Sequence, residues 1–214
     1  METGEIYSDL PILETERLIL RKVTIQDVND MFEYCSNQEV SRFVTWDAHE
    51  SLDDTKEFIG FVLNQYLHGK VAPWAIEYKE NHKMIGTIDF VSWNPGQNSA
   101  EIGYVLSPEY WGKGITTEAA KELIRFGFEN MDLIWIQARC FTENIGSARV
   151  MEKAGMKHEG ILRKGMKIKG KHWDLHVYSI LKEEYISSIE ENRKKKTTFK
   201  RLQGRNVRKK HVHF

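Results

Sequence analysis

The chain has 214 residues, 41% of them hydrophobic and 29% charged, which is the composition of a globular protein long enough to bury a core. Cys35 and Cys140 are its only cysteines, so we expect no disulfide framework and no metal or redox site built on paired cysteines. The sequence shows no secretory signal pattern and no apolar run long enough to cross a bilayer. We therefore expect a cytoplasmic protein with no membrane partner and no metal.

The net charge of zero conceals a separation of charge along the chain. Residues 192–214 contain ten Lys or Arg and no acidic residue, and taking those ten from the total of 31 leaves residues 1–191 with 21 basic and 31 acidic residues. We predict one domain over 1–190 and a flexible basic tail over 191–214. An acidic domain suits a cationic substrate. The tail could bind RNA or the ribosome, but a solvated tail is favoured because Phe199 and Phe214 are its only aromatic residues.

Periodicity and turn residues predict alternating strands and helices in chain order. Strands are expected at 17–23, 74–78, 84–93, 100–106, 133–141, 157–168 and 171–181. Helices are expected at 25–37, 52–67, 117–130 and 144–155, with a further polar helix from about 183. Because several strands are joined by tight turns and helices are interposed, the pattern favours an α+β fold with a mixed, mostly antiparallel sheet flanked by helices.

The most informative segment is 100–120, where a strand, a glycine-bearing turn and a helix follow one another. The start of a helix presents unpaired N–H groups and partial positive charge, and Gly112 and Gly114 let the backbone approach a ligand closely, so this arrangement suits a phosphate. The Walker A pattern fails because Lys113 is not followed by Ser or Thr. The dinucleotide pattern fails because Thr117 takes the place of its third glycine. An ordinary strand–loop–helix corner is the alternative.

The segment Trp111–Thr116, reading WGKGIT, resembles the acetyl-CoA loop of the GNAT superfamily of N-acetyltransferases. Trp111 stands where that motif usually has Arg or Gln, as in the branch of ribosomal-protein N-terminal acetyltransferases (RimJ/RimL-like). Two further blocks agree in order and spacing with the family. The first is the Asn144–Arg149 segment NIGSAR, with Gly155 after it, and the second is EGILR at 159–163. The resemblance covers residues 13–182 and implies the GNAT fold and acetyl-CoA as cosubstrate.

Carried over residue by residue, the resemblance implies that acetyl-CoA is held mainly by backbone groups. An N–H near Leu106 would polarise the thioester carbonyl, and pantetheine would run along the strand like an added strand. The implied acetyl-CoA-binding residues are Val105, Leu106, Trp111, Gly112, Lys113, Gly114, Ile115, Thr116, Thr117, Asn144 and Ser147. For Lys113, a solvated loop lysine is an equal alternative.

Two residues are catalytic candidates. Glu101 matches a position that serves as general base in some GNAT enzymes, and the alternative is a structural carboxylate paired with a cation. Ser147 is the hydroxyl expected near the sulfur of CoA, and Asn144 is also a natural helix N-cap. Met151 occupies the position at which many GNAT enzymes place a tyrosine acid, so the source of the thiolate's proton stays open. Cys140 is interpreted as an apolar filler of a buried strand and not as a nucleophile.

The function that these residues favour is acetyl transfer to a primary amine by direct attack in a ternary complex. The expected acceptor is a protein N-terminus or a small polar amine, recognised by the first two helices, their loop and the closing hairpin. Candidate recognition residues by position are Arg42, Trp46, Asp47, His49, Trp93, His172, Trp173 and Asp174. The alternative is a non-catalytic CoA-binding module that acts on RNA or the ribosome through its tail. Another acyl donor, such as succinyl-CoA, and a monomer or homodimer are left open.

Overall fold

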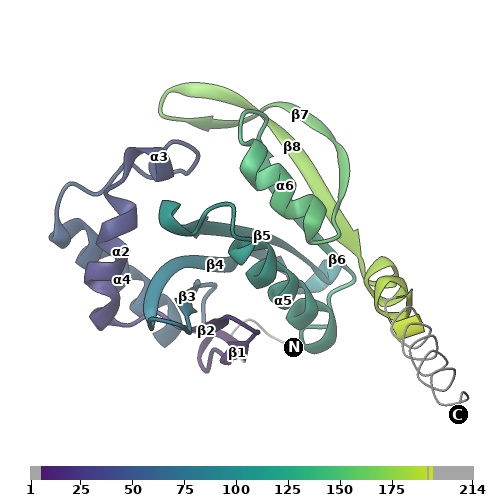
Figure 1. The fold of residues 1–214 in the computed structure, drawn as a ribbon. Coiled ribbons are helices and arrows are strands. Elements are labelled where there is room, and N and C mark those ends of the chain that lie inside the picture. Colours follow the sequence, from purple (N-terminus) through teal and green to yellow (C-terminus); the bar gives the residue numbers. More distant parts are fainter. Residues whose placement is uncertain (1–5, 192, 195–214) are drawn as a thin grey trace, which may run out of the picture. The chain divides into compact units, whose positions relative to one another are not determined.

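In the computed structural model, the described residues are 6–191, 193 and 194 (Figure 1). The chain divides into a unit that ends at Ile180 and contains almost the whole sheet, and a second unit that begins at Leu181. In the second unit, residues 182–191 are helical, as predicted from about 183. The prediction of a tail that binds RNA or the ribosome falls almost entirely outside the described residues. No described helix is both long and apolar enough to cross a membrane.

Eight strands form one sheet in the order β1-β2-β3-β4-β5-β6-β8-β7. The strands are β1 (Leu13–Glu14), β2 (Leu18–Lys22), β3 (Trp74–Tyr78), β4 (Lys83–Asn94), β5 (Ser99–Leu106), β6 (Trp135–Phe141), β7 (Lys157–Ile168) and β8 (Lys171–Leu181). The neighbours from β1 to β5 and the β7–β8 hairpin pair antiparallel, whereas β5 and β6 pair parallel. The predicted α+β fold with a mostly antiparallel sheet is therefore confirmed.

Helices and short 3-10 turns connect these strands. They are η1 (Ile25–Asp27), α2 (Val28–Cys35), α3 (Gln38–Ser41), α4 (Leu52–Leu67), η2 (Pro95–Gln97), η3 (Pro108–Tyr110), α5 (Ile115–Asn130) and α6 (Ile145–Lys153). Helix α5 packs on the face of the sheet to which Phe90 and Ile136 point, because both side chains approach Gly127 of that helix. Helices α2 and α4 lie side by side, away from α5 (Figure 1).

Several predicted boundaries need correction. The helix after the predicted phosphate loop starts at Ile115 and not at Thr117, because Gly114 adopts a positive φ of 76° and ends the loop two residues earlier than the threonines suggest. The predicted helix 25–37 divides into η1 and α2, and the four-residue α3 that follows was not expected. The strand predicted from residue 133 begins at Trp135. The remaining strands agree with prediction to within about two residues.

Candidate active site

The predicted phosphate loop connects β5 to α5 and is shaped by two glycines. Gly112 and Gly114 have φ values of 72° and 76°, in the left-handed region that side chains disfavour. The first intrahelical bond of α5 runs from the Glu118 N–H to the Gly114 carbonyl, 3.1 Å away. The amides of residues 115–117 therefore have no helical carbonyl to bond, which leaves them free for an anion.

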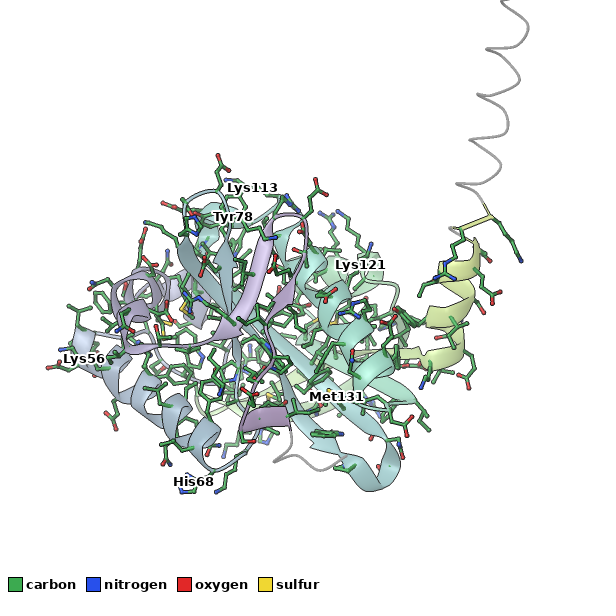
Figure 2. All side chains as sticks on the ribbon, turned by 90° about the horizontal axis from the view of Figure 1, so that it is seen from below. Lys56, His68, Tyr78, Lys113, Lys121 and Met131 are labelled. Atoms are coloured by element: carbon green, nitrogen blue, oxygen red, sulfur yellow. The ribbon has the colours of Figure 1, made fainter. Side chains whose placement is uncertain are left out.

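Side chains around the loop add one anchor and one cation. The Trp111 indole N–H donates to the Leu106 carbonyl (2.8 Å), which ties the loop to the end of β5. The ammonium of Lys113 lies over the ring of Tyr110, 5.3 Å from its centroid, and Tyr110 packs edge-on against Tyr78. Figure 2 shows Lys113 and Tyr78 near one another at one end of the molecule, with Met131, which follows α5, at the other end. The positive end of the α5 dipole is thus at the loop.

A further cation reaches this loop from a distant part of the sequence. Arg17 pairs with Glu118 in the first turn of α5 (2.7 Å) and donates to the Lys113 carbonyl (3.0 Å). Glu118 also accepts from the Thr15 hydroxyl at 2.6 Å. Burial acts to raise the pKa of Glu118, but the hydrogen bonds from Thr15 and Arg17 outweigh it and hold that pKa below its usual value. Sequence reasoning did not find Arg17, because it is almost a hundred residues from the loop.

The parallel strands β5 and β6 pair only over part of their length. The register joins residues 99–102 of β5 to residues 135–138 of β6, while the two strands continue to Leu106 and Phe141. Over residues 103–106, β5 remains paired with β4 on its other edge. The edge of β5 that faces β6 is therefore open at this end. We call this part of the molecule, residues 103–106 and 139–141, the splay.

The hydrogen-bonding direction of β5 at the splay follows from one bond. The Ser107 N–H donates to the Ile85 carbonyl of β4 (2.7 Å). Because successive residues of a strand direct their N–H groups to opposite edges, the N–H groups of Leu106 and Tyr104 point into the splay. An extended pantetheine chain can bond to such an edge as an added strand. Val105 turns its backbone toward β4, so its predicted contact with acetyl-CoA would come from its side chain.

On the face of the sheet that carries α5 and α6, two hydroxyl groups meet beside the splay. Asn144 caps α6 by accepting from the Ser147 N–H (3.0 Å), which confirms the predicted N-cap. The Ser147 hydroxyl lies 2.9 Å from the hydroxyl of Tyr104. Burial raises the pKa of Tyr104 well above its usual value, although the bond to Ser147 acts to lower it. Both hydroxyls are therefore protonated at neutral pH, and the Tyr104 O–H can also donate to the Ser147 carbonyl, 3.1 Å away. Their roles stay a prediction.

Glu101 lies on the opposite face of β5 and is not free. One carboxylate oxygen accepts from the Arg139 guanidinium Nε–H (2.8 Å) and the other from the Gln137 amide (2.8 Å), and the side chain is 10% exposed. This arrangement agrees with the alternative of a carboxylate paired with a cation. The general-base role stays a prediction.

Most of the predicted acceptor-recognition segments lie together. Phe43, beside Arg42, packs on Phe141 and on the same cluster as Trp173 of the closing hairpin. The Lys169 ammonium pairs with Asp47 at 3.2 Å and also donates to the Ser41 carbonyl. The loop between α3 and α4 and the β7–β8 hairpin therefore meet at the end of β6. Trp93 is not part of this group, since it lies on β4 with its ring 6.4 Å from that of Tyr7.

Cys140 is buried on β6, and this burial raises the pKa of its thiol to about 11. A thiol with such a pKa is protonated at neutral pH and is a weak nucleophile, which agrees with its interpretation as a filler. Among the described residues, no group of three or more His, Cys, Asp or Glu side chains is arranged to hold a metal ion.

Comparison with known proteins identifies the class. Residues 17–157 match the acetyltransferase (GNAT) domain family. The chain is 38% identical over 172 residues to the uncharacterized N-acetyltransferase YoaA of Bacillus subtilis, covering 80% of this chain and 97% of that protein. The crystal structure of a GNAT-family acetyltransferase from Bacillus anthracis, 32% identical, superposes with a TM-score of 0.73 over 81% of this chain and 99% of that one.

The same fold occurs in RimL, a ribosomal L7/L12 alpha-N-protein acetyltransferase solved in complex with coenzyme A. RimL is 19% identical, with a TM-score of 0.71 over 80% of this chain and 98% of that one, so this likeness concerns the fold alone. The chain belongs to the GNAT acetyltransferase family. It is an acetyl-CoA-dependent N-acetyltransferase, as the resemblance of its loop predicted.

Proposed function

We propose that this enzyme transfers the acetyl group of acetyl-CoA to a cationic primary amine, most favourably the N-terminus of a protein, by direct attack in a ternary complex. The observation that carries the proposal is the splay, where an open backbone edge lies between a carboxylate-bearing face and a hydroxyl-bearing face. Such an arrangement can hold a thioester in the plane of the sheet while an amine approaches from one side.

In this proposal each part of the site has its own task. The amides of residues 115–117 and the guanidinium of Arg17 bind the phosphates of acetyl-CoA. The Leu106 or Tyr104 N–H donates to the thioester carbonyl and stabilises the oxyanion that forms on attack. The paired hydroxyls of Tyr104 and Ser147 donate a hydrogen bond toward the departing sulfur. Tyr104 would thus supply the phenol that Met151 cannot.

Two observations favour a protein N-terminus over a small amine, namely the contact between loop and hairpin and the likeness to RimL, while the acidic composition suits a cationic acceptor of either kind. The predicted recognition segments, a loop and a hairpin from distant parts of the sequence, lie against one another, so side chains from both could contact successive residues of a peptide. Residues 1–191 carry ten more acidic than basic residues, which suits a cationic acceptor. RimL, which shares the fold, is named for acetylating a ribosomal protein N-terminus. The predicted cytoplasmic location is compatible with an intracellular protein acceptor.

The test measures acetyl-CoA binding by calorimetry and amine-dependent CoA release in parallel. The acceptor panel holds peptides with different N-terminal residues, polyamines and amino sugars. We expect saturable acetyl-CoA binding and release of CoA with N-terminal peptides, together with acetylation of the α-amine detected by mass spectrometry. Release of CoA only with a polyamine or an amino sugar would show that the acceptor is a small amine and not a protein N-terminus. Binding without release from any acceptor would contradict the proposal.

A further inference from the structure

One carboxylate on the face of the sheet that bears Glu101 has no part in any described bond. Asp89 lies in the middle of β4, directly opposite Gly103 of β5, and no hydrogen bond or ion pair involves its side chain among the described residues. It is partly exposed, neither sealed in the core nor on the open surface. An unpaired carboxylate in such a position is costly, and aspartate is disfavoured in strands. A cost of this kind points to a ligand that compensates the charge.

The direction of Asp89 follows from its neighbours on β4. Phe90 approaches Gly127 of α5, so Phe90 points toward α5 and the preceding side chain points to the other face. Asp89 therefore shares a face with Glu101 and opposes the hydroxyl of Tyr104, which bonds to Ser147 of α6. A carboxylate and a pair of hydroxyls thus lie on opposite sides of the same stretch of β5.

Gly103 brings this carboxylate close to the splay. A Cβ atom built on Gly103 would lie 3.5 Å from the Asp89 Oδ1 and only 2.6 Å from a methyl of Val91. The Asp89 carboxylate therefore leans over Gly103, the first residue of β5 beyond its pairing with β6. Since neighbouring strands are about 4.8 Å apart, a group above Gly103 is within about one strand spacing of the open edge. Because Gly103 has no side chain, the space above it is shared by the Asp89 carboxylate and a methyl of Val91.

We propose that Asp89 holds the ammonium group of the acceptor and takes its proton, in place of Glu101. This inference rests on the proposed function. Glu101 is already neutralised by the guanidinium of Arg139, which leaves Asp89 as the carboxylate on this face without a partner among the described residues. Glu101 then acts as a positioning residue that fixes Arg139 and Gln137 at the end of the pairing between β5 and β6.

The reaction balances with these groups. The acceptor ammonium gives one proton to Asp89 and becomes a neutral amine. Its nitrogen attacks the thioester carbon, so a C–N bond forms and the C–S bond breaks. The second proton lost by the nitrogen ends on the CoA sulfur, with the hydroxyls of Tyr104 and Ser147 on that side, and Asp89 returns its proton to water.

The protonation behaviour of Asp89 agrees with this task. Burial raises the pKa of Asp89 to about 7. The titratable groups coupled to it are the phenols of Tyr66 from α4 and Tyr7 from the N-terminal segment. Burial raises the pKa of both phenols well above 10, so both stay neutral near pH 7 and neither changes the charge around Asp89. A base with a pKa close to the working pH is well suited to accept a proton.

The test compares Asp89→Asn, Asp89→Glu and Glu101→Gln, with Glu129→Gln as a charge-matched control, since Glu129 pairs with Arg125 near the far end of α5. We expect Asp89→Asn to lower kcat/KM at least about 100-fold near pH 7.5 and to remove the limb of the pH profile with a pKa of about 7. Asp89→Glu keeps that limb at a reduced rate. The Kd of acetyl-CoA stays within about twofold in all variants.

A loss of this limb in Glu101→Gln but not in Asp89→Asn would overturn the proposal and return the base role to Glu101. An Asp89→Asn variant that stays within about threefold of the wild-type protein would overturn it as well. A readout without turnover keeps the two proposals separate: the Asp89 carboxyl is titrated by 13C NMR in the wild-type protein. We expect a pKa near 7 that falls when a short peptide with a free N-terminus is added in the presence of CoA. An unchanged value, or a pKa near 4, contradicts the role of Asp89 whether or not an acceptor is turned over.

Discussion

The assignment of the loop before α5 as a phosphate-binding site can be tested with two substitutions at Gly114 that have nearly the same shape and differ by one negative charge. The variants are Gly114→Asp and Gly114→Asn, because both side chains tolerate a positive φ better than most and differ mainly in charge. There is room for either, since a Cβ atom at Gly114 would meet only Arg17 Nη2, at 3.7 Å. The strain of about 1 kcal/mol expected at a φ of 76° is common to both and cancels in the comparison.

The expected difference follows from Coulomb's law. A carboxylate about 6 Å from a pyrophosphate carrying two charges, at an effective dielectric constant of about 40, is repelled by roughly 3 kcal/mol. This corresponds to a Kd for acetyl-CoA about 100-fold weaker in Gly114→Asp than in Gly114→Asn. The new carboxylate would also compete with the phosphates for Arg17, which acts in the same direction.

Calorimetry of both variants with acetyl-CoA, at low salt and at 1 M salt, measures this difference. We expect the gap between the two variants to narrow at high salt, because the Debye length falls to about 3 Å. Thermal unfolding of both variants serves as a control for the fold. Equal affinities in Gly114→Asp and Gly114→Asn would refute the reasoning, because a phosphate held at this loop cannot be indifferent to a neighbouring carboxylate.

Three further predictions concern the strands around the splay. Gly86→Ala should lower the melting temperature by roughly 2–10 °C and weaken acetyl-CoA binding, because the new Cβ would lie 2.2 Å from the Val105 carbonyl oxygen. Gly60→Ala is the control and should not lower the melting temperature, because a Cβ there meets nothing within 4 Å. Tyr104→Phe should reduce kcat about tenfold or more with an unchanged Kd for acetyl-CoA, and a wild-type rate would exclude its hydroxyl from the reaction. The raised pKa of Asp89 means that the folded state binds this proton more tightly, so the stability it contributes is present below about pH 4 and is lost as the pH rises through about 7. The unfolding free energy of the wild-type protein minus that of Asp89→Asn should therefore fall between pH 5 and pH 8, by about 1–3 kcal/mol after allowance for the exposed surface of Asp89, and a flat difference would contradict the raised pKa.

Local chemistry explains what could be predicted from the sequence. The glycines before α5 and the Asn144 cap act on backbone groups within a few residues, so the local sequence is sufficient to predict the glycine turn and the helix cap. The start of α5 was placed two residues late because Thr116 and Thr117 are β-branched and favour a later helix start. The two-residue β1 and four-residue α3 were missed because such short elements have no period to detect.

Contacts between distant residues explain what was missed. Tyr104 and Ser147 are 43 residues apart, and Glu101 and Arg139 are 38 apart, so neither pair leaves a local signal. Asp89 could be read only as one polar residue in a strand. The proposed role of Asp89 depends on three features: its carboxylate has no described partner, its side chain points away from α5, and Gly103 lies opposite it. These features exist together only after β4 and β5 have paired.

The splay results from contacts that hold the ends of β5 and β6 to different neighbours. The end of β5 remains paired with β4, because Gly86 lets the two strands approach closely and the Ser107 N–H donates to the Ile85 carbonyl. The end of β6 goes the other way: Phe141 packs on Ile168 and Leu175 of the closing hairpin, and the Thr142 N–H donates to the Asp174 carbonyl. Beyond residue 102, β5 therefore pairs only with β4, and the end of β6 contacts the β7–β8 hairpin. The edge left open between β5 and β6 is where, in the proposed function, the acetyl group is held. Because the same hairpin also meets the loop after α3, the contacts that open the splay also build the proposed acceptor surface. Under the proposed function, substrate recognition and catalysis therefore depend on the same packing.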